Sequence, residues 1–386
     1  MERVNSDSEK QLKTFGWAAF LNDFGSDIIF PLWPIFLSTV LGANLAVIGF
    51  IDGLGEAIVS ISQAVSGYLS DKIGRRKPFI WLGYVCAGVA RVGYALSPTW
   101  HFIIPFRILD RSGKMRGSPR DAIIADISTN QNRGRNFGYL RMMDNLGAVF
   151  GVLFTISFFQ YLGYKRLFLL AAVPSLLGAA LIFSVIKDRP RSDAKLFRGL
   201  SFKDFDKNFI LFLVLSSVFA LSSFSYSFLL IYAGKLGFAV TTIPVLYLIY
   251  TAIASAMSLP FGRLADVMSR KAVLGLSFLL WLLVCVTFIY FKNPIAVVLA
   301  FILYGLHLGA IEPAQKALVS ELSAPDLRAS TLGAFQMITG LVALPSSVIA
   351  GILWSTAGSL APFYFSAGLT IIAGGMLFFI KNVRFS

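Results

Sequence analysis

Long apolar stretches, separated by short polar segments, run along the whole chain. Each stretch has roughly 20 residues or more, which is the length of helix needed to cross the ~30 Å hydrocarbon core of a bilayer. The pattern therefore predicts an all-α, polytopic membrane protein with twelve transmembrane helices. The predicted helices span residues 14–40, 47–70, 78–97, 101–126, 136–160, 166–187, 208–233, 241–261, 272–291, 294–320, 330–355 and 361–381.

A polar signature occurs twice along this pattern. Each copy has a glycine, an aspartate four residues later and a basic pair four residues after the aspartate. The two aspartates are separated by 266 − 71 = 195 residues, and the same offset carries Asp126 onto Glu321. A register shared by separate regions predicts an internal duplication. The two copies are Gly67, Asp71, Arg75 and Arg76, and Gly262, Asp266, Arg270 and Lys271.

The duplication predicts a chain made of two similar halves. We expect residues 1–187 and 208–386 to form two pseudo-symmetric six-helix bundles around a central cavity. The segment 188–207 between them is rich in lysine and arginine and is predicted to be a basic cytoplasmic linker.

Composition and charge agree with a membrane protein. Of the 386 residues, 56% are hydrophobic and 14% are charged, whereas soluble domains carry about 25% charged residues. The net charge of +14 could indicate nucleic-acid binding, but the lysines and arginines concentrate in the segments on the side of the N-terminus. This positive-inside distribution predicts a multi-pass protein of the cell (inner) membrane, with both termini in the cytoplasm and no nucleic-acid partner.

The first copy of the signature resembles that of a known family. Residues Gly67 to Lys77 read G-Y-L-S-D-K-I-G-R-R-K, which is similar to the loop between the second and third helices of the major facilitator superfamily. The second copy differs by Ser269 in place of Gly74, and Arg107 lies in helix four, where the family often has an arginine. The resemblance covers the whole chain and implies secondary transport by alternating access. We expect a monomer whose partners are a small-molecule substrate, protons and the lipid bilayer.

The signature is predicted to form a conformational gate. Gly67 allows close approach of two helices, and Gly74 allows a tight turn. Asp71 is placed to meet the positive N-terminal end of a helix in the other half, a contact that would hold the cytoplasmic side closed. Alternatively, the basic residues only set the topology. The predicted gate residues are Gly67, Asp71, Gly74, Arg75, Arg76, Arg133, Gly262, Asp266, Arg270 and Arg328.

Ionisable residues within the predicted helices are candidates for proton coupling, because each costs at least ~2.5 kcal/mol at the bilayer centre and tends to face a cavity or a partner. Asp23 and Asp27 are one helical turn apart, and two carboxylates so close in a low dielectric do not both ionise freely. His307 lies near the middle of helix ten and is a residue type that titrates near physiological pH. The predicted proton-coupling residues are Asp23, Asp27, Glu56, His307 and Glu312.

Polar residues on helices one, four, seven and ten are predicted to contact the substrate, because these helices line the cavity in the family. If helix four is regular, its three cations lie within about 60° of one another. Helix seven is rich in serine, so the predicted cavity is charged in the first half and neutral in the second. The predicted substrate-binding residues are Asn22, Asp23, Asp27, Arg107, Arg111, Lys114, Ser223, Tyr226, His307 and Glu312.

The favoured function is proton-coupled export of a small polar or amphipathic organic compound. Two other transport functions stay open: export of a divalent metal ion by the acidic residues of helices one and two, and uptake of an anionic metabolite by the arginines of helix four. The charges could also form a structural network, for example Asp110 with Lys114. Enzyme motifs such as H-E-x-x-H and G-x-S-x-G are absent, so we expect neither an enzyme nor a cofactor, and no metal site.

Overall fold

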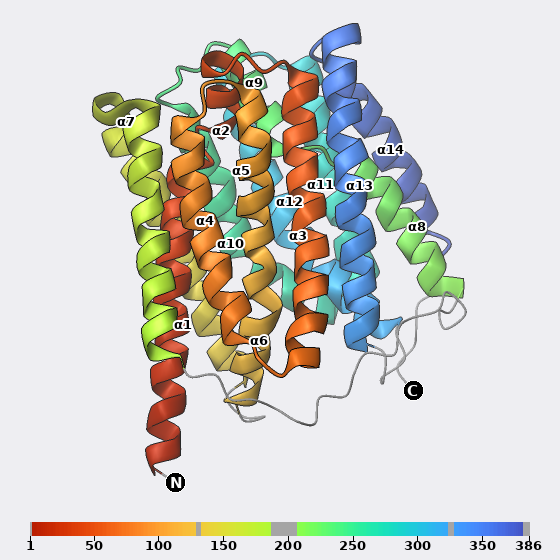
Figure 1. Ribbon diagram of the computed structural model, residues 1–386. Helices are drawn as coiled ribbons and strands as arrows, with labels where there is room; N and C mark the ends of the chain where they lie inside the picture. Colours follow the sequence, from red (N-terminus) through yellow and green to blue (C-terminus); the bar gives the residue numbers. More distant parts are fainter. Residues whose placement is uncertain (1, 129–132, 187–206, 323–327, 381–386) are drawn as a thin grey trace. The chain divides into compact units, whose positions relative to one another are not determined.

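The computed structural model describes residues 2–128, 133–186, 207–322 and 328–380, and every regular element in this part of the chain is a helix (Figure 1). The N-terminal half contains α1 (Glu2–Ile29), α2 (Trp33–Ile35), the π-helical turn η1 (Phe36–Val40), α3 (Leu45–Ile73), α4 (Lys77–Leu96), α5 (Trp100–Ser112), the 3₁₀ turn η2 (Gly113–Arg116), α6 (Gly117–Asp126) and α7 (Arg133–Val185). The C-terminal half contains α8 (Lys207–Ser222), α9 (Tyr226–Lys235), α10 (Ile243–Val267), α11 (Arg270–Tyr290), α12 (Pro294–Glu321), α13 (Arg328–Ala357) and α14 (Ala361–Leu377).

The helices coincide with the predicted membrane crossings. Among the described residues, 8 helical stretches are long and apolar enough to cross a membrane. One of them, Asn136–Val185, holds two predicted crossings, because Gly163 has a φ of 63° and kinks α7 into two helices. Glycine adopts this left-handed conformation without steric cost. The remaining crossings coincide with α1, with α5 and α6, and with the shorter apolar α14.

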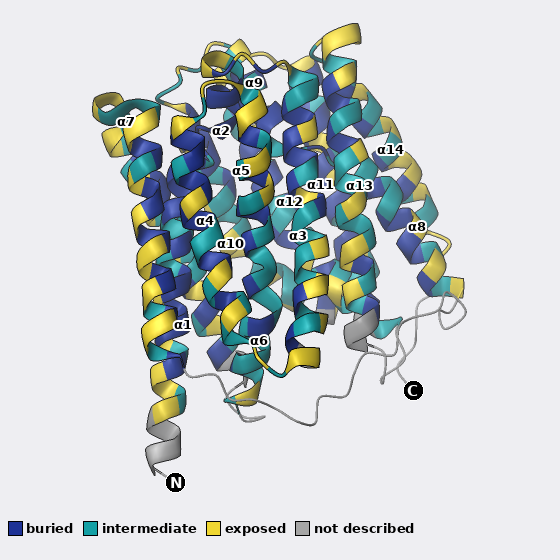
Figure 2. Cartoon of the chain, viewed as in Figure 1, coloured by how far each residue is buried: buried dark blue, intermediate teal, exposed yellow. Residues whose placement is uncertain are grey.

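Many exposed side chains are large and apolar. Figure 2 shows exposed residues recurring along the helices. Phe102, Leu177 and Phe183 are among the exposed large apolar side chains. A soluble protein rarely exposes apolar surface of this extent. Contact with lipid chains accounts for it.

The chain divides into two compact units. Unit 1 comprises residues 1–42 and 58–197, and unit 2 comprises residues 43–57 and 198–386. Helix α3 therefore contributes to both units, because its first part packs with the C-terminal helices and its second part with the N-terminal helices.

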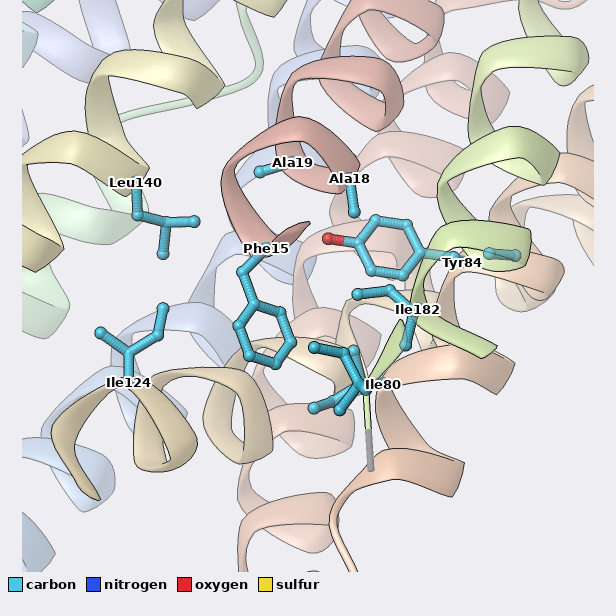
Figure 3. Packing of buried hydrophobic residues seen from close by; sticks show 10 residues of the cluster. Phe15, Ala18, Ala19, Ile80, Tyr84, Ile124, Leu140 and Ile182 are labelled. Carbon is cyan, nitrogen blue, oxygen red and sulfur yellow. The ribbon is translucent and has the colours of Figure 1, made fainter. Parts of the chain in front are cut away.

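The core of unit 1 is built from α1, α4, α6 and α7. Phe15 of α1 points toward Ile124 and Leu140 on one side and toward Ile80 on the other (Figure 3). Helices α1 and α7 pack backbone to backbone, because a Cβ atom on Gly151 would overlap the carbonyl oxygen of Phe24. Close approach at small residues is a general route to helix association in membranes, where the hydrophobic effect does not drive it.

The first part of α3 packs in the same way within unit 2. A Cβ atom on Gly53 would lie 2.7 Å from the Cα atom of Leu344, and one on Gly49 would overlap the carbonyl oxygen of Ser347. Gly351 of α13 approaches the backbone at Leu45 equally closely. This G-x-x-x-G contact between α3 and α13 places Asp52, which lies between the two glycines, inside unit 2.

Candidate functional site

A buried arginine joins three helices of unit 1. Arg91 of α4 is 1% exposed and donates to Ser26 Oγ at 2.7 Å and to the carbonyl oxygen of Asn22 at 3.1 Å, both on α1. It also donates to the carbonyl oxygen of Ala171 at 3.0 Å and to Ser175 Oγ, both on α7. The planar guanidinium has five N–H donors and can therefore bond acceptors on two different helices at once. Arg91 therefore fixes the polar face of α1 against α7.

This network holds one of the predicted substrate-binding residues in place. The side-chain oxygen of Asn22 accepts from Ser175 Oγ at 3.0 Å, and its amide nitrogen donates to Asp23 Oδ1 at 2.8 Å. Asn22 is 1% exposed. Its geometry favours positioning of the Asp23 carboxylate over direct contact with a substrate.

Asp23 belongs to a group of four charges from four elements. Lys114 of η2 interacts electrostatically with Asp23, and Asp144 of α7 interacts with Asp23, Arg120 and Lys114. Arg120 Nη1 of α6 lies 3.8 Å from Asp144 Oδ1. We call Asp23, Lys114, Arg120 and Asp144 the charge cluster. Further charges surround it, because Arg120 Nε lies 3.1 Å from Asp121 Oδ1 and Arg141 interacts with Asp144.

Helix four differs from the regular helix on which the sequence analysis relied. It is interrupted by the 3₁₀ turn η2, because Gly113 and Gly83 of α4 approach so closely that a Cβ atom on Gly113 would lie 2.6 Å from the carbonyl oxygen of Gly83. The two arginines lie on α5 and the lysine on η2. Lys114 interacts electrostatically with Arg111 across this change of helix type, and the common face of the three cations stays a prediction.

The two arginines of α5 lie against aromatic rings. The guanidinium carbon of Arg107 is 4.7 Å from the ring centroid of Trp33, and that of Arg111 is 4.9 Å from the ring centroid of Phe30. Their side chains are largely buried, and Arg111 Nε lies 3.8 Å from Asp110 Oδ2. Cation–π contacts of this kind stabilise a desolvated cation by about 2 kcal/mol. They favour a structural role for both arginines.

Asp27 and Glu56 lie in different units. Asp27 is 8% exposed within unit 1, whereas Glu56 lies at the end of the α3 segment of unit 2 and is exposed. Glu56 interacts electrostatically with Tyr304 of α12.

Tyr304 belongs to a group of four tyrosines in unit 2. The ring centroids of Tyr226 and Tyr247 are 5.6 Å apart, those of Tyr247 and Tyr250 are 5.0 Å apart, and those of Tyr250 and Tyr304 are 5.0 Å apart. We call Tyr226, Tyr247, Tyr250 and Tyr304 the tyrosine cluster. With Glu56 beside it, the cluster combines aromatic faces, hydroxyl groups and one carboxylate.

Helix seven is also broken. α8 ends at Ser222 and α9 begins at Tyr226, so the continuous helix that the sequence predicted over this stretch is wrong. The carboxylate of Asp52 accepts from Ser225 Oγ at 2.7 Å and from Ser227 Oγ at 2.5 Å. Ser225 caps α9 by accepting from the backbone nitrogen of Ser227 at 3.2 Å. A carboxylate at a helix N-terminus is favoured by the helix dipole. Ser223, a predicted substrate-binding residue, lies in the break and is half-buried.

The two predicted residues on α12 have local partners. His307 is 1% exposed, its Nδ1 atom is 2.8 Å from Ser277 Oγ, and its ring packs on Trp281 with centroids 5.5 Å apart. This is a hydrogen-bonded core histidine, which argues against the predicted roles in proton coupling and substrate binding. Glu312 accepts from Lys316 Nζ at 2.6 Å on the exposed side of the same helix.

The loop signature forms matching contacts in the two units. Arg76 Nη1 lies 2.5 Å from Asp126 Oδ2, and Arg270 Nη1 lies 2.5 Å from Glu321 Oε2. The two arginines are separated by 270 − 76 = 194 residues, whereas the sequence register of 195 had matched Arg270 with Arg75. The second loop is thus one residue shorter. The turn at Gly74 has a φ of 69°, as predicted.

The first glycine of each signature lies near a neighbouring helix. Gly67 allows close approach, since a Cβ atom there would lie 3.3 Å from the Cβ atom of Ser118, and one on Gly262 would lie 3.9 Å from that of Pro313. The side chains of four predicted gate residues lie outside the described part of the chain: Asp71, Arg133, Asp266 and Arg328.

Three residues that the sequence analysis did not select prove central to these contacts. Arg91 and Asp144 are ionisable residues within predicted helices, and that property alone is a signal of a cavity or a partner. Asp52 carried the same signal. Among the described residues, no group of three or more His, Cys, Asp or Glu side chains is placed to hold a metal ion.

Comparison with known proteins identifies the family. The model of the major facilitator superfamily matches residues 15–232 and 210–385. The chain belongs to the major facilitator superfamily. An uncharacterised transporter of this superfamily from Methanocaldococcus jannaschii, MJ1317, is 35% identical over 97% of both chains.

Two more distant relatives of this superfamily transporter carry functional names. The multidrug resistance protein MdtH of Aeromonas hydrophila is 26% identical over 80% of this chain and 79% of its own length. The quinolone resistance protein NorA of Staphylococcus aureus is 26% identical over 60% of each chain. Among solved structures, the nucleoside transporter NupG has a TM-score of 0.79 at 16% identity, covering 97% of this chain and 100% of its own.

These comparisons confirm the predicted family and fold class. The protein is a multi-pass membrane protein with the twelve-helix, two-bundle layout of the superfamily, and it is a secondary transporter of small molecules, not an enzyme. The structural likeness to NupG supports the fold alone, because the sequence identity is too low to assign a substrate to this chain.

Proposed function

We propose that this transporter exports amphipathic aromatic compounds in exchange for protons. The observation that carries the proposal is the charge cluster of unit 1, in which Asp23 and Asp144 both interact with Lys114 and Asp144 also interacts with Arg120. Protonation of either carboxylate removes one negative charge from beside these cations in a medium of low dielectric. The two protonation states therefore differ in interaction energy, which is the condition for a ligand to shift a conformational equilibrium.

The tyrosine cluster supports the substrate class. Aromatic rings at 5.0 to 5.6 Å offer stacking faces, and the phenol hydroxyls can bond polar groups of the same molecule. The carboxylate of Glu56 near Tyr304 favours compounds that carry a positive charge. The names of MdtH and NorA refer to multidrug and quinolone resistance, which agrees with export of such compounds.

The location of the protein and the gate also remain proposals. We propose a protein of the cell membrane with both termini in the cytoplasm, on the basis of the positive-inside distribution. A monomer is proposed as well. The loop signature, including Asp71, Arg75 and Asp266, is proposed to stabilise the state in which the cytoplasmic side is closed. The Arg76–Asp126 and Arg270–Glu321 contacts support an ordered loop in each unit.

Transport by purified protein in liposomes tests the coupling. We expect Asp23→Asn and Asp144→Asn to abolish accumulation of a fluorescent aromatic cation driven by an imposed pH gradient, and to retain exchange of the same compound at equal pH. Asp27→Asn and Glu56→Gln are measured alongside, because both were predicted from the sequence. Glu9→Gln serves as control, since Glu9 forms an exposed pair with Lys13 at 2.7 Å. Gradient-driven accumulation at the parent level in all four test variants would contradict proton coupling by these acids.

Substrate contact by the tyrosine cluster is tested separately. We expect Tyr226→Leu and Tyr250→Leu to raise the half-saturation concentration of the aromatic cation about two- to tenfold. Each variant removes a ring whose stacking contributes about 0.5–1.5 kcal/mol. Tyr364→Leu is a control, since Tyr364 is an exposed residue of α14 outside the cluster. An unchanged half-saturation in both cluster variants would exclude the cluster as the binding surface.

A further inference from the structure

Unit 2 has a groove between α11 and α14 that lies outside the residues assigned to transport. In unit 2, α11 and α14 leave a cavity of about 490 Å³, lined by apolar residues that include Gly275, Leu279, Ile371 and Phe378. A single water needs only about 15 Å³, so this is a large space. Its lining is apolar except at one end, where Ser269 and Lys271 lie, and at Thr370. The hydroxyl of Thr370 donates to the carbonyl oxygen of Ser366 at 2.7 Å.

Comparison with the equivalent place in unit 1 explains the cavity. Lys77 and Lys271 make matching contacts, because Lys77 Nζ donates to the carbonyl oxygen of Phe183 at 2.7 Å and Lys271 Nζ to that of Phe378 at 3.3 Å. Their separation is 271 − 77 = 194 residues, and the same offset places Trp81 opposite Gly275. In the first half of the chain an indole therefore occupies the position that a glycine holds in the second half.

In unit 1 the indole packs against the corresponding phenylalanine. The ring centroids of Trp81 and Phe183 are 5.5 Å apart, and Lys77 Nζ lies 5.0 Å from the centroid of Phe183. In unit 2, Phe378 is 82% exposed, and a Cβ atom on Gly275 would meet only Leu377, at 3.4 Å. The groove between α11 and α14 is open because a large side chain is missing there.

We propose that this groove binds the acyl chain of an anionic phospholipid, with its headgroup at Lys271. An apolar void in a membrane protein loses dispersion contacts unless hydrocarbon fills it, and lipid chains surround the protein. Lys271 Nζ also donates to the carbonyl oxygen of Ile380 at 2.9 Å. An ammonium has three donors, so one remains for a phosphate oxygen. A lysine at the membrane surface favours anionic over zwitterionic lipid.

Native mass spectrometry of the full chain tests this site independently of transport. The protein is released from micelles that contain phosphatidylglycerol or phosphatidylcholine with identical chains. We expect the wild-type protein to retain one phosphatidylglycerol in preference to phosphatidylcholine. Gly275→Trp, which restores the indole of the other half, should abolish this retention. Ile372→Trp adds the same indole to an exposed position of α14 outside the groove lining and should leave retention unchanged.

The headgroup contact has its own variant. We expect Lys271→Gln to weaken phosphatidylglycerol binding about fivefold, which corresponds to about 1 kcal/mol for one lysine, and to leave phosphatidylcholine binding unchanged. Lys292→Gln removes a charge beyond the other end of α11 and is the control. If Gly275→Trp fails to fold, Gly275→Leu replaces it. Equal retention of both lipids by the wild-type protein, or unchanged retention in the groove variants, would overturn the proposal.

Discussion

The contact between Asp52 and the break in helix seven yields a quantitative prediction. Asp52 is 3% exposed and accepts from Ser225 Oγ and Ser227 Oγ at 2.7 and 2.5 Å. Hydrogen bonds to a charged acceptor contribute about 1.5–3 kcal/mol in soluble proteins, whereas side-chain bonds between membrane helices average about 0.6 and reach about 1.7 kcal/mol. With two bonds at about 1–1.5 kcal/mol each, Asp52→Ala should cost about 2–3 kcal/mol of stability.

Reversible unfolding in mixed micelles of increasing dodecyl sulfate content, followed by tryptophan fluorescence, measures this cost. Asp52→Asn keeps an acceptor oxygen and should lose less than half as much as Asp52→Ala. In a double-mutant cycle of Asp52→Ala with the paired variant Ser225→Ala and Ser227→Ala, we expect a coupling energy of about 1–2 kcal/mol, because the same two bonds are removed by either change.

A purely electrostatic role for Asp52 makes a different prediction. If the carboxylate acts only through the dipole of α9, it contributes about 0.3–1 kcal/mol and does not need the hydroxyl groups. Its loss would then add to the loss of the serines. Ser217→Ala is the matched control, since Ser217 Oγ donates within α8 to the carbonyl oxygen of Leu213 at 2.8 Å. A coupling energy with Ser225 and Ser227 no larger than with Ser217 would refute the hydrogen-bonded contact.

Two further predictions concern unit 1. Arg91→Lys should destabilise the protein by about 3 kcal/mol, because an ammonium cannot replace the planar guanidinium that reaches both α1 and α7. The fraction of folded protein that remains after heating is measured by size-exclusion chromatography. A loss of folded protein no greater than that of Ser175→Ala alone would contradict this role of Arg91. Asp71→Asn should raise the labelling rate of a cysteine at Gln315, a half-buried position of α12, in a background without Cys86 and Cys285. The expected increase is about fivefold if closure loses about 1 kcal/mol, and an unchanged rate would remove Asp71 from the gate.

Crossing positions could be predicted from the sequence, because the membrane fixes the length of an apolar helix and the duplication fixes the number of crossings in each half. Breaks within the crossings could not. The 3₁₀ turn η2 depends on the mutual approach of Gly83 and Gly113, and the break before α9 depends on the bonds of Ser225 and Ser227 to Asp52. Both breaks are determined by contacts between residues that are far apart in the sequence. Helical periodicity is a local pattern and therefore does not predict them.

The candidate site was predicted only in part, for a similar reason. Asp23 was selected because it lies one turn from Asp27 on the same helix, a relation that is visible in the sequence. Its interactions with Lys114 and Asp144 join three segments and become visible only in three dimensions. Arg91 offered no local pattern, since its acceptors lie on α1 and α7.

The duplication shows which charged contacts the two units share. The contacts of Arg76 and Arg270 with their acids recur in both units, as expected for the loop signature that the two halves have in common. The charge cluster does not recur. Lys114 corresponds to Gly309, since 309 − 114 = 195, and Asp144 corresponds to Thr339, since 339 − 144 = 195. The second bundle lacks these charges, and each is costly within a membrane, so their presence in the first bundle supports the proposed role in proton coupling.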